Sequence, residues 1–368
     1  MGALPSRMDA VLLTGHGGFD KLAYRTDVPV PRAGAGEVLI RVAAAGVNNT
    51  DINTRVGWYS KAVADGTGPI GAAGADRIDD ADAAWSGTPL AFPRIQGADC
   101  CGTIVGVGEA VAPERIGERV LVRNMLRTYV GYRPFECWTF GSECDGAFAQ
   151  FATAPARETY RVDCGWSDEE LASIPCAYST AENMLHRAKV LPGETVLITG
   201  ASGGVGSAAV QLARRRGATV VAVTSASKEE AVKALGADRI VRRDADPLAV
   251  IGPRQVDVVV DMVGGEASAR CIEVLKPGGR YAIAGAIAGP IATWDLRTIY
   301  LRDLVILGCT FQDDAVFENL VGYIERNEIR PVVSKVYPLS SIAEAQRDFL
   351  DKGFIGKLVL TPPPEQRP

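Results

Sequence analysis

Residues 195–206 read TVLITGASGGVG, an apolar run that leads directly into a glycine-rich loop. The run is typical of a buried parallel strand, and residues 205–216 carry apolar side chains at helical spacing. Glycines let a backbone approach a phosphate closely, and a helix N-terminus favours its negative charge. We therefore predict that the loop binds the pyrophosphate of a dinucleotide, although its GxxGGxG spacing departs from GxGxxG. The predicted cofactor-binding residues here are Gly200, Ser202, Gly203, Gly204, Val205 and Gly206.

Beyond the loop, strands and helices continue to alternate. Strands are predicted at 219–223, 239–241, 256–260 and 279–283, with a helix over 228–235. Repeated βα units of this kind predict a doubly wound parallel sheet in an α/β protein. Ligands bind beyond the carboxyl ends of such strands. The residues there are expected to frame the nicotinamide and its ribose, with a plain turn role left open: Val263, Gly264, Gly285, Ala286 and Ile287.

The end of the second strand indicates which dinucleotide is bound. An NAD site normally places a carboxylate there for the ribose 2′-hydroxyl, yet this chain has none before Glu229. The hydroxyls of Ser225 and Ser227 and the ammonium of Lys228 suit a 2′-phosphate instead. We therefore predict NADP(H) as cofactor. The alternative for Lys228 is that it lies solvated on the next helix.

The segments that flank this unit have a different pattern. Their short apolar strands are separated by glycine and proline, which is typical of an irregular antiparallel barrel. A helix over 342–350 and a last strand over 357–360 are expected to rejoin the first domain. We predict a catalytic domain of residues 1–165 and 320–368 around a cofactor domain of residues 166–319. The predicted barrel strands are 10–13, 37–42, 102–108 and 119–122.

Composition limits the class of protein. With 368 residues, of which 47% are hydrophobic and 23% charged, the chain is expected to fold into two packed domains. A net charge of -5 without a large basic block argues against a nucleic-acid partner. No signal-peptide pattern and no run of 18 apolar residues is present, so we expect a cytoplasmic protein without a membrane partner. The eight cysteines form no CxxC pair and are expected to be reduced thiols.

Residues 58–93 are rich in Ala, Gly and Asp and match no motif. A loop of this length is either a functional lid or a flexible surface insertion. Its aromatic side chains Tyr59, Trp85 and Phe92 could line a substrate pocket or pack the loop, and the sequence leaves both roles open.

Four further motifs, read together with the glycine loop, resemble the medium-chain dehydrogenase/reductase superfamily. Within it, the chain is similar to the zinc-free branch of quinone oxidoreductases. The resemblance implies a GroES-like barrel as catalytic domain, a Rossmann domain for the cofactor, and a small-molecule substrate in the cleft between them. It also implies a homodimer or homotetramer built through the Rossmann domains. The four motifs are Gly36–Val42, Gly46–Asp51, Gly117–Val120 and Leu235–Asp238.

The same resemblance implies three positions for a catalytic zinc, and this chain fills them with Asn48, Ala98 and Cys176. One thiol out of three ligands cannot hold zinc in the usual tetrahedral site, so we predict no metal. A rescue by Asp51, Asp99 or Cys100 stays open, because carboxylates and thiolates are legitimate ligands. The structural zinc lobe needs four close cysteines, whereas only Cys137 and Cys144 lie in that region.

Without a metal to lower the pKa of an alcohol, reduction of a polarised acceptor is the more natural chemistry. We expect hydride transfer from NADPH to an α,β-unsaturated carbonyl or a quinone. By resemblance, Asn48 would stabilise the enolate oxygen, Thr50 would relay a proton and Thr180 would contact the nicotinamide; Tyr59 is a weaker candidate proton donor. The alternatives are an alcohol or aldehyde dehydrogenase with an atypical zinc site, and a non-catalytic NADPH-binding protein.

The two histidines are not expected to take part in the reaction. His16 is predicted to lie in a loop, and His186 to cap or pack a helix.

Overall fold

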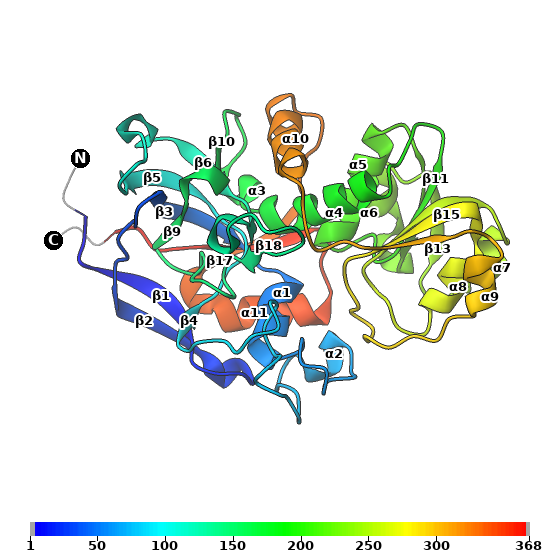
Figure 1. The fold of residues 1–368 in the computed structure, drawn as a ribbon, viewed down its shortest axis with the longest axis horizontal. Helices are drawn as coiled ribbons and strands as arrows, with labels where there is room; N and C mark the ends of the chain where they lie inside the picture. The colour runs from blue at the N-terminus through cyan, green and yellow to red at the C-terminus, as the bar shows by residue number, and fades with distance from the viewer. Residues whose placement is uncertain (1–3, 366–368) are drawn as a thin grey trace.

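The computed structural model describes residues 4–365 of the chain. In Figure 1 a group of small curved sheets lies at the left and an open sheet covered by helices lies at the right. Helices α4 (Pro175–Arg187) and α10 (Asp314–Glu325) pack against each other between the two groups.

The open sheet is the doubly wound parallel sheet that the sequence predicts. Its six strands run in the order β13-β12-β11-β14-β15-β16, and every neighbouring pair is parallel. The order reverses between β11 and β14, which is where sheets of this kind bind their ligand. The strands are β11 (Thr195–Ile198), β12 (Thr219–Thr224), β13 (Arg239–Arg242), β14 (Val256–Asp261), β15 (Leu275–Ile283) and β16 (Val305–Gly308).

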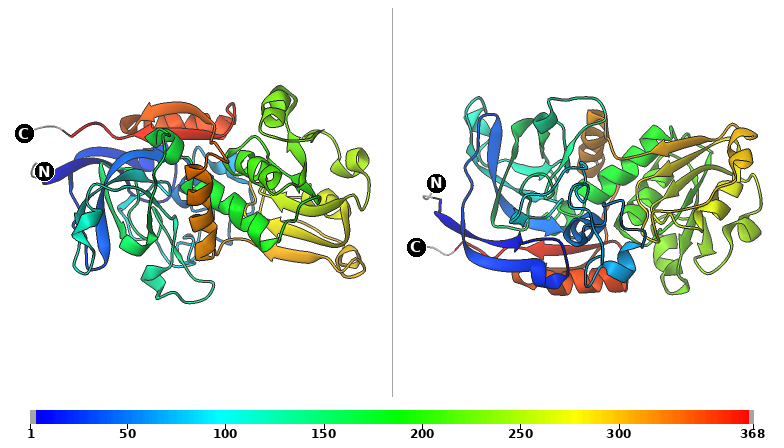
Figure 2. Two further views of the ribbon diagram at one scale, coloured as in Figure 1. Left: turned by 90° about the horizontal axis from the view of Figure 1, so that it is seen from above. Right: turned by 60° about the horizontal axis from the view of Figure 1, so that its bottom comes forward.

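Both faces of this sheet are buried, as the continuous apolar runs indicate. Val196 and Ile198 of β11 pack in the cluster that contains α4, α5 and α10, whereas Leu197 packs in the cluster on the opposite face with α8. Successive side chains of a strand point to opposite faces, so a run without polar interruption requires helices on both sides. The helices are α5 (Gly204–Arg215), α6 (Glu229–Ala234), α7 (Pro247–Ile251), α8 (Ser268–Glu273) and α9 (Leu296–Tyr300), and Figure 2 shows their placement.

The barrel is built from three sheets, and each predicted barrel strand is present. The largest sheet runs β10-β6-β5-β3-β18-β17, with β9 also paired to β3; the others are β2-β1-β4 and β7-β8. Two register shifts in the pairing of β3 with β5 bend the sheet, as bulges do. The strands are β1 (Arg7–Leu13), β2 (Leu22–Pro29), β3 (Glu37–Gly46), β4 (Arg94–Ile95), β5 (Cys101–Val107), β6 (Arg119–Val122), β7 (Met125–Leu126), β8 (Trp138–Thr139), β9 (Phe151–Pro155) and β10 (Thr159–Arg161). A short helix, α3 (Asp168–Leu171), follows them.

After the open sheet the chain returns to the barrel, as the sequence predicts. Strand β18 (Lys357–Thr361) pairs in parallel with β17 (Val333–Pro338) and antiparallel with β3. Helix α11 (Ile342–Asp351) connects these two strands. The strands therefore divide between the two domains as expected, while the proposed domain limits remain a prediction.

The segment 58–93 is packed against the barrel rather than loosely attached to it. Its Val63 and Ile70 join Ile52 and Val56 in a small buried cluster. The cluster connects α1 (Asn49–Val56), α2 (Thr67–Ile70) and α11, which lie close together in Figure 1.

The buried Arg55 adds three polar ties to this region. Its guanidinium donates to the carbonyl oxygens of Gly17 and Gly71 at 2.7 and 2.5 Å, and to Gln346 Oε1 at 2.9 Å. Because these three acceptors lie in the N-terminal loop, the 58–93 insertion and α11, one side chain holds the three segments together.

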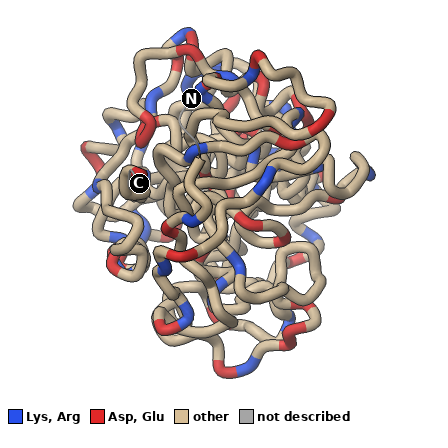
Figure 3. The backbone as a smooth tube through the Cα atoms, turned by 90° about the vertical axis from the view of Figure 1, so that its left-hand side faces the viewer, with Lys and Arg blue, Asp and Glu red and all other residues tan. Residues whose placement is uncertain are grey.

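Charged residues of both signs are interspersed on the side of the molecule drawn in Figure 3. Within residues 4–365, no helix is long and apolar enough to cross a membrane.

Candidate functional site

The glycine loop stands at the switch point of the sheet, between β11 and α5. Gly200 has a φ of +59°, and a Cβ on Gly206 would lie 2.1 Å from the carbonyl oxygen of Gly200. Any side chain at Gly206 would therefore force the helix away from the strand. The predicted loop residues Gly200 and Ser202 to Val205 are partly exposed, so their backbone is accessible to a phosphate.

The predicted 2′-phosphate residues lie together at the end of β12. The hydroxyl oxygens of Ser225 and Ser227 are 3.3 Å apart. Lys228 is not solvated on a helix: its ammonium donates to the carbonyl oxygens of Lys352 and Phe354, each at 2.6 Å. The segment after α11 thus reaches across to the cofactor domain at this point.

The ends of β14 and β15 form a small cavity of about 270 Å³. Asp261 lines it, and its carboxylate accepts hydrogen bonds from the amide of Gly264 at 3.2 Å and from the Tyr281 hydroxyl at 2.8 Å. The predicted Gly264, Gly285 and Ala286 line the cavity. Val263 and Ile287 lie beside it and are partly exposed. Their two segments are joined by hydrogen bonds from the amide of Ile287 to the carbonyl oxygen of Met262 and from the amide of Ala288 to that of Val263.

The insertion reaches this cavity from the barrel side. The amide of Thr67, the first residue of α2, donates to the carbonyl oxygen of Ile287 at 3.2 Å. A Cβ on Gly66 would lie 2.5 Å from the same oxygen, so glycine is needed for this approach. The Thr67 hydroxyl in turn donates to Asn53 Oδ1 at 2.8 Å. A segment that the sequence left as lid or surface loop therefore bridges the two domains.

On the barrel side, Asn48, Asp99 and Lys357 form a buried polar cluster. The Lys357 ammonium lies 2.8 Å from Asp99 Oδ2 and also donates to Asn48 Oδ1 and to the carbonyl oxygen of Val47. Asn48 Nδ2 donates to the same carboxylate oxygen at 2.8 Å. The side chains of Lys357 and Asp99 are only 3% and 0% exposed, so their charges are balanced inside the protein rather than by water.

Neighbouring backbone is shaped around this cluster. The amide of Cys176 donates to Asp99 Oδ1 at 2.6 Å, which places the carboxylate at the positive N-terminus of α4. A Cβ on Gly46 would lie 2.3 Å from Asp99 Oδ2, and one on Gly204 would lie 2.9 Å from Lys357 Cδ. Because position 46 has no side chain, the carboxylate of Asp99 fits against the backbone there. Because position 204 has no side chain, the aliphatic part of Lys357 can pass along the glycine loop.

These contacts do not fit a catalytic zinc. Asn48 and Ala98 offer no strong ligand, and both oxygens of Asp99 are occupied by donors from the chain. Burial, and then the charge of Asp99, raises the pKa of the Cys176 thiol, which disfavours the thiolate that zinc needs. Across residues 4–365, no three His, Cys, Asp or Glu side chains are grouped to hold a metal ion. The rescue by Asp99 that the sequence left open has no support in this geometry.

Asp51 lies beside the cluster and is buried. Its carboxylate accepts hydrogen bonds from the backbone amides of Asn48 at 2.8 Å and of Ala98 at 3.3 Å. Burial raises the pKa of Asp51 to about 7, and the charge of Asp99 adds to the rise, while the two amides and Lys357 oppose it. Its place in the loop fits an anchor for the residues that follow β3.

Thr50 lies in the first turn of α1 and Tyr59 lies just after the end of this helix, and both are partly exposed. The Thr50 Oγ1 and Tyr59 hydroxyl oxygens are 3.0 Å apart. The Tyr59 ring packs edge-on against Trp85, with centroids 4.9 Å apart. Burial raises the pKa of Tyr59, so its hydroxyl stays protonated and can donate.

The remaining predicted residues separate into those near the site and those away from it. Thr180 follows Cys176 by one helical turn on α4 and is partly exposed, as expected for a residue that contacts a cofactor. His16 binds the Thr54 carbonyl oxygen and packs on Phe92, so Phe92 packs the loop. His186 lies at the surface, 3.8 Å from Asp313.

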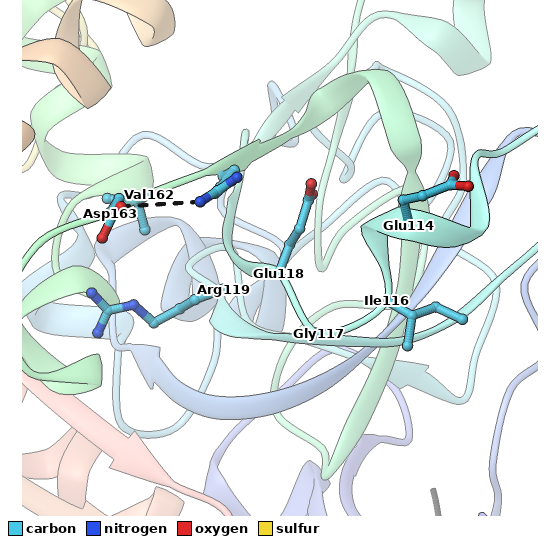
Figure 4. A pocket seen from close by; sticks show the side chains of 8 residues that line it. Glu114, Ile116, Gly117, Glu118, Arg119, Val162 and Asp163 are labelled. Atoms are coloured by element: carbon cyan, nitrogen blue, oxygen red, sulfur yellow. Dashed lines mark ion pairs between the residues drawn. The ribbon is translucent and has the colours of Figure 1, made fainter.

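A larger hollow of about 450 Å³ lies on the barrel, away from all the predicted site residues. Figure 4 shows that charged side chains, among them Glu114, Glu118 and Asp163, surround it. It contains none of the chemistry described above.

Sequence reasoning missed two lysines that the structure brings to predicted site residues: Lys352, whose carbonyl oxygen binds Lys228, and Lys357, whose ammonium binds Asn48. A signal exists for Lys357, because a charged residue stands at the head of the apolar strand 357–360. Only the pairing of β18 with β3 brings it to Asn48, through the hydrogen bond from the Val47 amide to the Leu358 carbonyl oxygen.

Comparison with known proteins agrees with this architecture. Residues 34–163 match the model of the alcohol dehydrogenase GroES-like domain, and residues 204–326 match that of the zinc-binding dehydrogenase family. The chain is 30% identical to the synaptic vesicle membrane protein VAT-1 homolog of Rattus norvegicus, over 97% of this chain and 84% of that protein. It is 28% identical to acryloyl-coenzyme A reductase of Metallosphaera sedula, over 96% of this chain and 100% of that enzyme.

A solved structure agrees over nearly the whole length. It is a Sinorhizobium meliloti 1021 protein provisionally described as an alcohol dehydrogenase, 45% identical over 98% of each chain, with a TM-score of 0.86. The fold and site thus define an oxidoreductase with a GroES-like and a Rossmann domain that takes a nicotinamide cofactor. The chain belongs to the medium-chain dehydrogenase/reductase superfamily.

The raised pKa of Asp51 predicts how stability depends on pH. Between about pH 4 and pH 7 the folded state keeps the proton that the unfolded chain, with a pKa near 3.8, has already lost. This carboxyl group therefore lowers the free energy of unfolding as pH rises through that window, by at most about 1.4 kcal/mol per pH unit. Urea unfolding of the wild type and of Asp51→Asn, from pH 4.5 to 8, should show the wild type losing stability relative to the variant. Parallel pH profiles would show that Asp51 is ionised in the folded protein.

Proposed function

We propose that this chain is an NADPH-dependent reductase that transfers hydride to the β-carbon of an α,β-unsaturated carbonyl compound, or to a quinone, without zinc. The observation that carries the proposal is the buried Lys357–Asp99–Asn48 cluster, whose hydrogen bonds use both polar ends of Asn48, one of the three implied zinc positions, and neutralise the neighbouring Asp99. The name of the acryloyl-coenzyme A reductase relative supports reduction of a conjugated double bond. The absence of a carboxylate before Glu229 at the end of β12 supports NADP(H).

Hydride comes from the reduced nicotinamide when the cofactor is bound. As it bonds to the β-carbon, the electron pair of the carbon–carbon double bond shifts to the bond between the α-carbon and the carbonyl carbon, the carbonyl pair moves to oxygen, and the resulting enolate takes a proton from water at its α-carbon. We assign the Tyr59 hydroxyl as donor to that oxygen and Thr50 as its relay partner, because they are hydrogen-bonded and partly accessible. Thr180 and the ends of β14 and β15 would hold the nicotinamide beside them.

We propose a different role for Asn48 from the stabilisation of the enolate oxygen that the resemblance implied. Its amide nitrogen donates to Asp99 and its oxygen accepts from Lys357, so both ends are used within the protein. We propose that Asn48 positions the Lys357 ammonium and leaves donation to the substrate to Tyr59 and Thr50.

A single screen tests the reaction class. Protein purified without added metal should contain well below about one zinc per chain, and should oxidise NADPH with enones or quinones equally well before and after EDTA. Stoichiometric zinc together with oxidation of secondary alcohols would instead make the chain a dehydrogenase with an atypical metal site. NADPH binding without turnover of any enone, quinone or aldehyde would identify a non-catalytic cofactor-binding protein.

The role of Tyr59 predicts a specific kinetic defect. Tyr59→Phe should lower kcat/KM for the enone by about tenfold to several hundredfold, because one donor to the developing oxyanion is lost, while the Kd for NADPH stays unchanged. Tyr132→Phe is the matched control, since Tyr132 lies outside the site and stacks its ring on Arg127 and Arg157. If Tyr59→Phe turned over within twofold of wild type, the assignment of Tyr59 as hydrogen-bond donor to the oxyanion would be wrong.

We further propose that two copies of the chain associate through the edge strand β16. Val305 and Ile306 are 47% and 38% exposed there, and Tyr300 and Leu301 beside them are 63% and 69% exposed. Because β16 ends the parallel sheet, one of its edges has unpaired backbone groups, and a second copy related by a two-fold axis can pair with it.

This association predicts that Val305→Lys converts the protein to a monomer in sedimentation velocity. Val336→Lys is the matched control: it makes the same change at a residue 44% exposed on β17, the edge strand of the barrel sheet. An unchanged dimer or tetramer with Val305→Lys, or a monomer with Val336→Lys alone, would place the interface elsewhere.

A further inference from the structure

The loop that follows α11 runs along the whole cofactor site. Lys352 and Phe354 offer their carbonyl oxygens to Lys228, at the predicted 2′-phosphate end. The amide of Gly356 donates to the carbonyl oxygen of Ser202 in the glycine loop at 2.9 Å. Lys357 then enters the buried polar cluster with Asp99 and Asn48. Six consecutive residues of the barrel side, 352–357, therefore meet the cofactor domain at two points before reaching the reacting end.

Lys228 by itself is an incomplete phosphate site. An ammonium group has three N–H donors, and Lys228 uses two of them on the carbonyl oxygens of Lys352 and Phe354. One hydrogen bond remains for a group that carries a charge near -2 and three acceptor oxygens. Ser225 and Ser227 can donate two more hydrogen bonds, but they add no charge. A second cation is therefore needed to match the phosphate.

Lys352 adjoins Lys228, because its carbonyl oxygen accepts a hydrogen bond from the Lys228 ammonium at 2.6 Å. Its ammonium lies 3.9 Å from the centroid of the Phe349 ring, which holds the side chain in place. Burial, and to a smaller extent the nearby charge of Lys228, lowers the pKa of Lys352 to about 8. Burial, and then the charge of Arg243 just after β13, likewise lowers the pKa of Lys228. Among residues 4–365, no carboxylate forms an ion pair with any of these three cations.

We propose that Lys352 is a specificity residue for NADP(H), which binds the ribose 2′-phosphate together with Lys228, Ser225 and Ser227. The proposal rests on the proposed use of NADP(H). It adds that cofactor choice depends on the barrel side of the cleft, through a residue outside the βα unit where such specificity is usually encoded. Two neighbouring ammonium groups without an anion repel each other, and a phosphate dianion between them removes this repulsion.

The test is binding of adenosine 2′,5′-bisphosphate and of AMP, measured by calorimetry, together with fluorescence titration of NADPH and NADH. Lys352→Gln should weaken binding of the bisphosphate and of NADPH about tenfold to a hundredfold, which is the range for one lost charged hydrogen bond. Binding of AMP and NADH should stay within about twofold. Glutamine is chosen because Lys352 has a φ of +53°, a conformation that costs Gln and Lys alike.

Two further variants separate charge from position. Lys352→Arg should keep most of the preference for the 2′-phosphate, because the cation is retained. Lys233→Gln removes a lysine from α6, where Lys233 pairs with Glu230 at the surface, and should leave both affinities unchanged. A loss of phosphate affinity with Lys233→Gln as large as that with Lys352→Gln would show a general charge effect and overturn the proposal.

A measurement on the wild type does not depend on any variant folding. Lys352 is partly deprotonated at about pH 8.5, and the phosphate charge should raise its pKa, so binding of the bisphosphate should take up protons. Calorimetry in buffers of different ionisation enthalpy measures this uptake, which should be absent with AMP.

The outcomes distinguish the two proposals. If the wild type binds NADH as tightly as NADPH, the proposed NADP(H) preference is wrong and the role of Lys352 falls with it. If the wild type prefers NADPH and Lys352→Gln keeps the same ratio, only the role of Lys352 is overturned.

Discussion

The buried ion pair between Lys357 and Asp99 is the interaction on which the arrangement of the site depends. Both charges are withdrawn from water, and removing either partner would leave the other uncompensated at a cost of about 3–5 kcal/mol. The pair is tolerated because each group is also hydrogen-bonded: Asp99 by Asn48 and the Cys176 amide, Lys357 by Asn48 and the Val47 carbonyl. The last strand of the chain, the loop after β3 and the start of α4 must therefore assemble together.

This constraint extends to the cofactor domain. Because Lys357 is held in the cluster, the residues just before it are placed along the glycine loop and the end of β12, where Gly356 and Lys352 contact Ser202 and Lys228. On the opposite side of the cleft, Thr67 of the insertion meets Ile287. The two domains are thus joined at both ends of the proposed cofactor groove by segments that begin in the barrel. A change in domain closure would therefore alter the contacts at both ends of this proposed groove, between Lys352 and Lys228 and between Thr67 and Ile287.

The cluster also shows what stands in this chain near the positions that would bind zinc. From the sequence, Asn48 and Ala98 could only be recognised as poor ligands, and Asp99 remained a possible substitute. In the folded protein an ammonium group neutralises Asp99, so the charge that a metal would have balanced is balanced by the chain. Both polar ends of the Asn48 side chain are bonded to Lys357 and Asp99, which is why we propose Thr50 and Tyr59 as the donors to the substrate. The insertion supplies Trp85 as packing for Tyr59, whereas Phe92 packs on a loop histidine.

The sequence by itself determined the features that are local in the chain. The apolar run 195–199, the glycines after it and the helical spacing of 205–216 specify a strand, a tight glycine turn and a helix, because periodicity and glycine act over a few residues. The lack of a carboxylate near Ser225 is equally local. Only the tertiary structure decided which distant side chains share the site. Lys357 is 258 residues from Asp99 along the chain, and Lys352 is 124 from Lys228. No pattern within one segment records such contacts, since they arise when β18 pairs with β3 and long-range burial forces isolated charges to find partners.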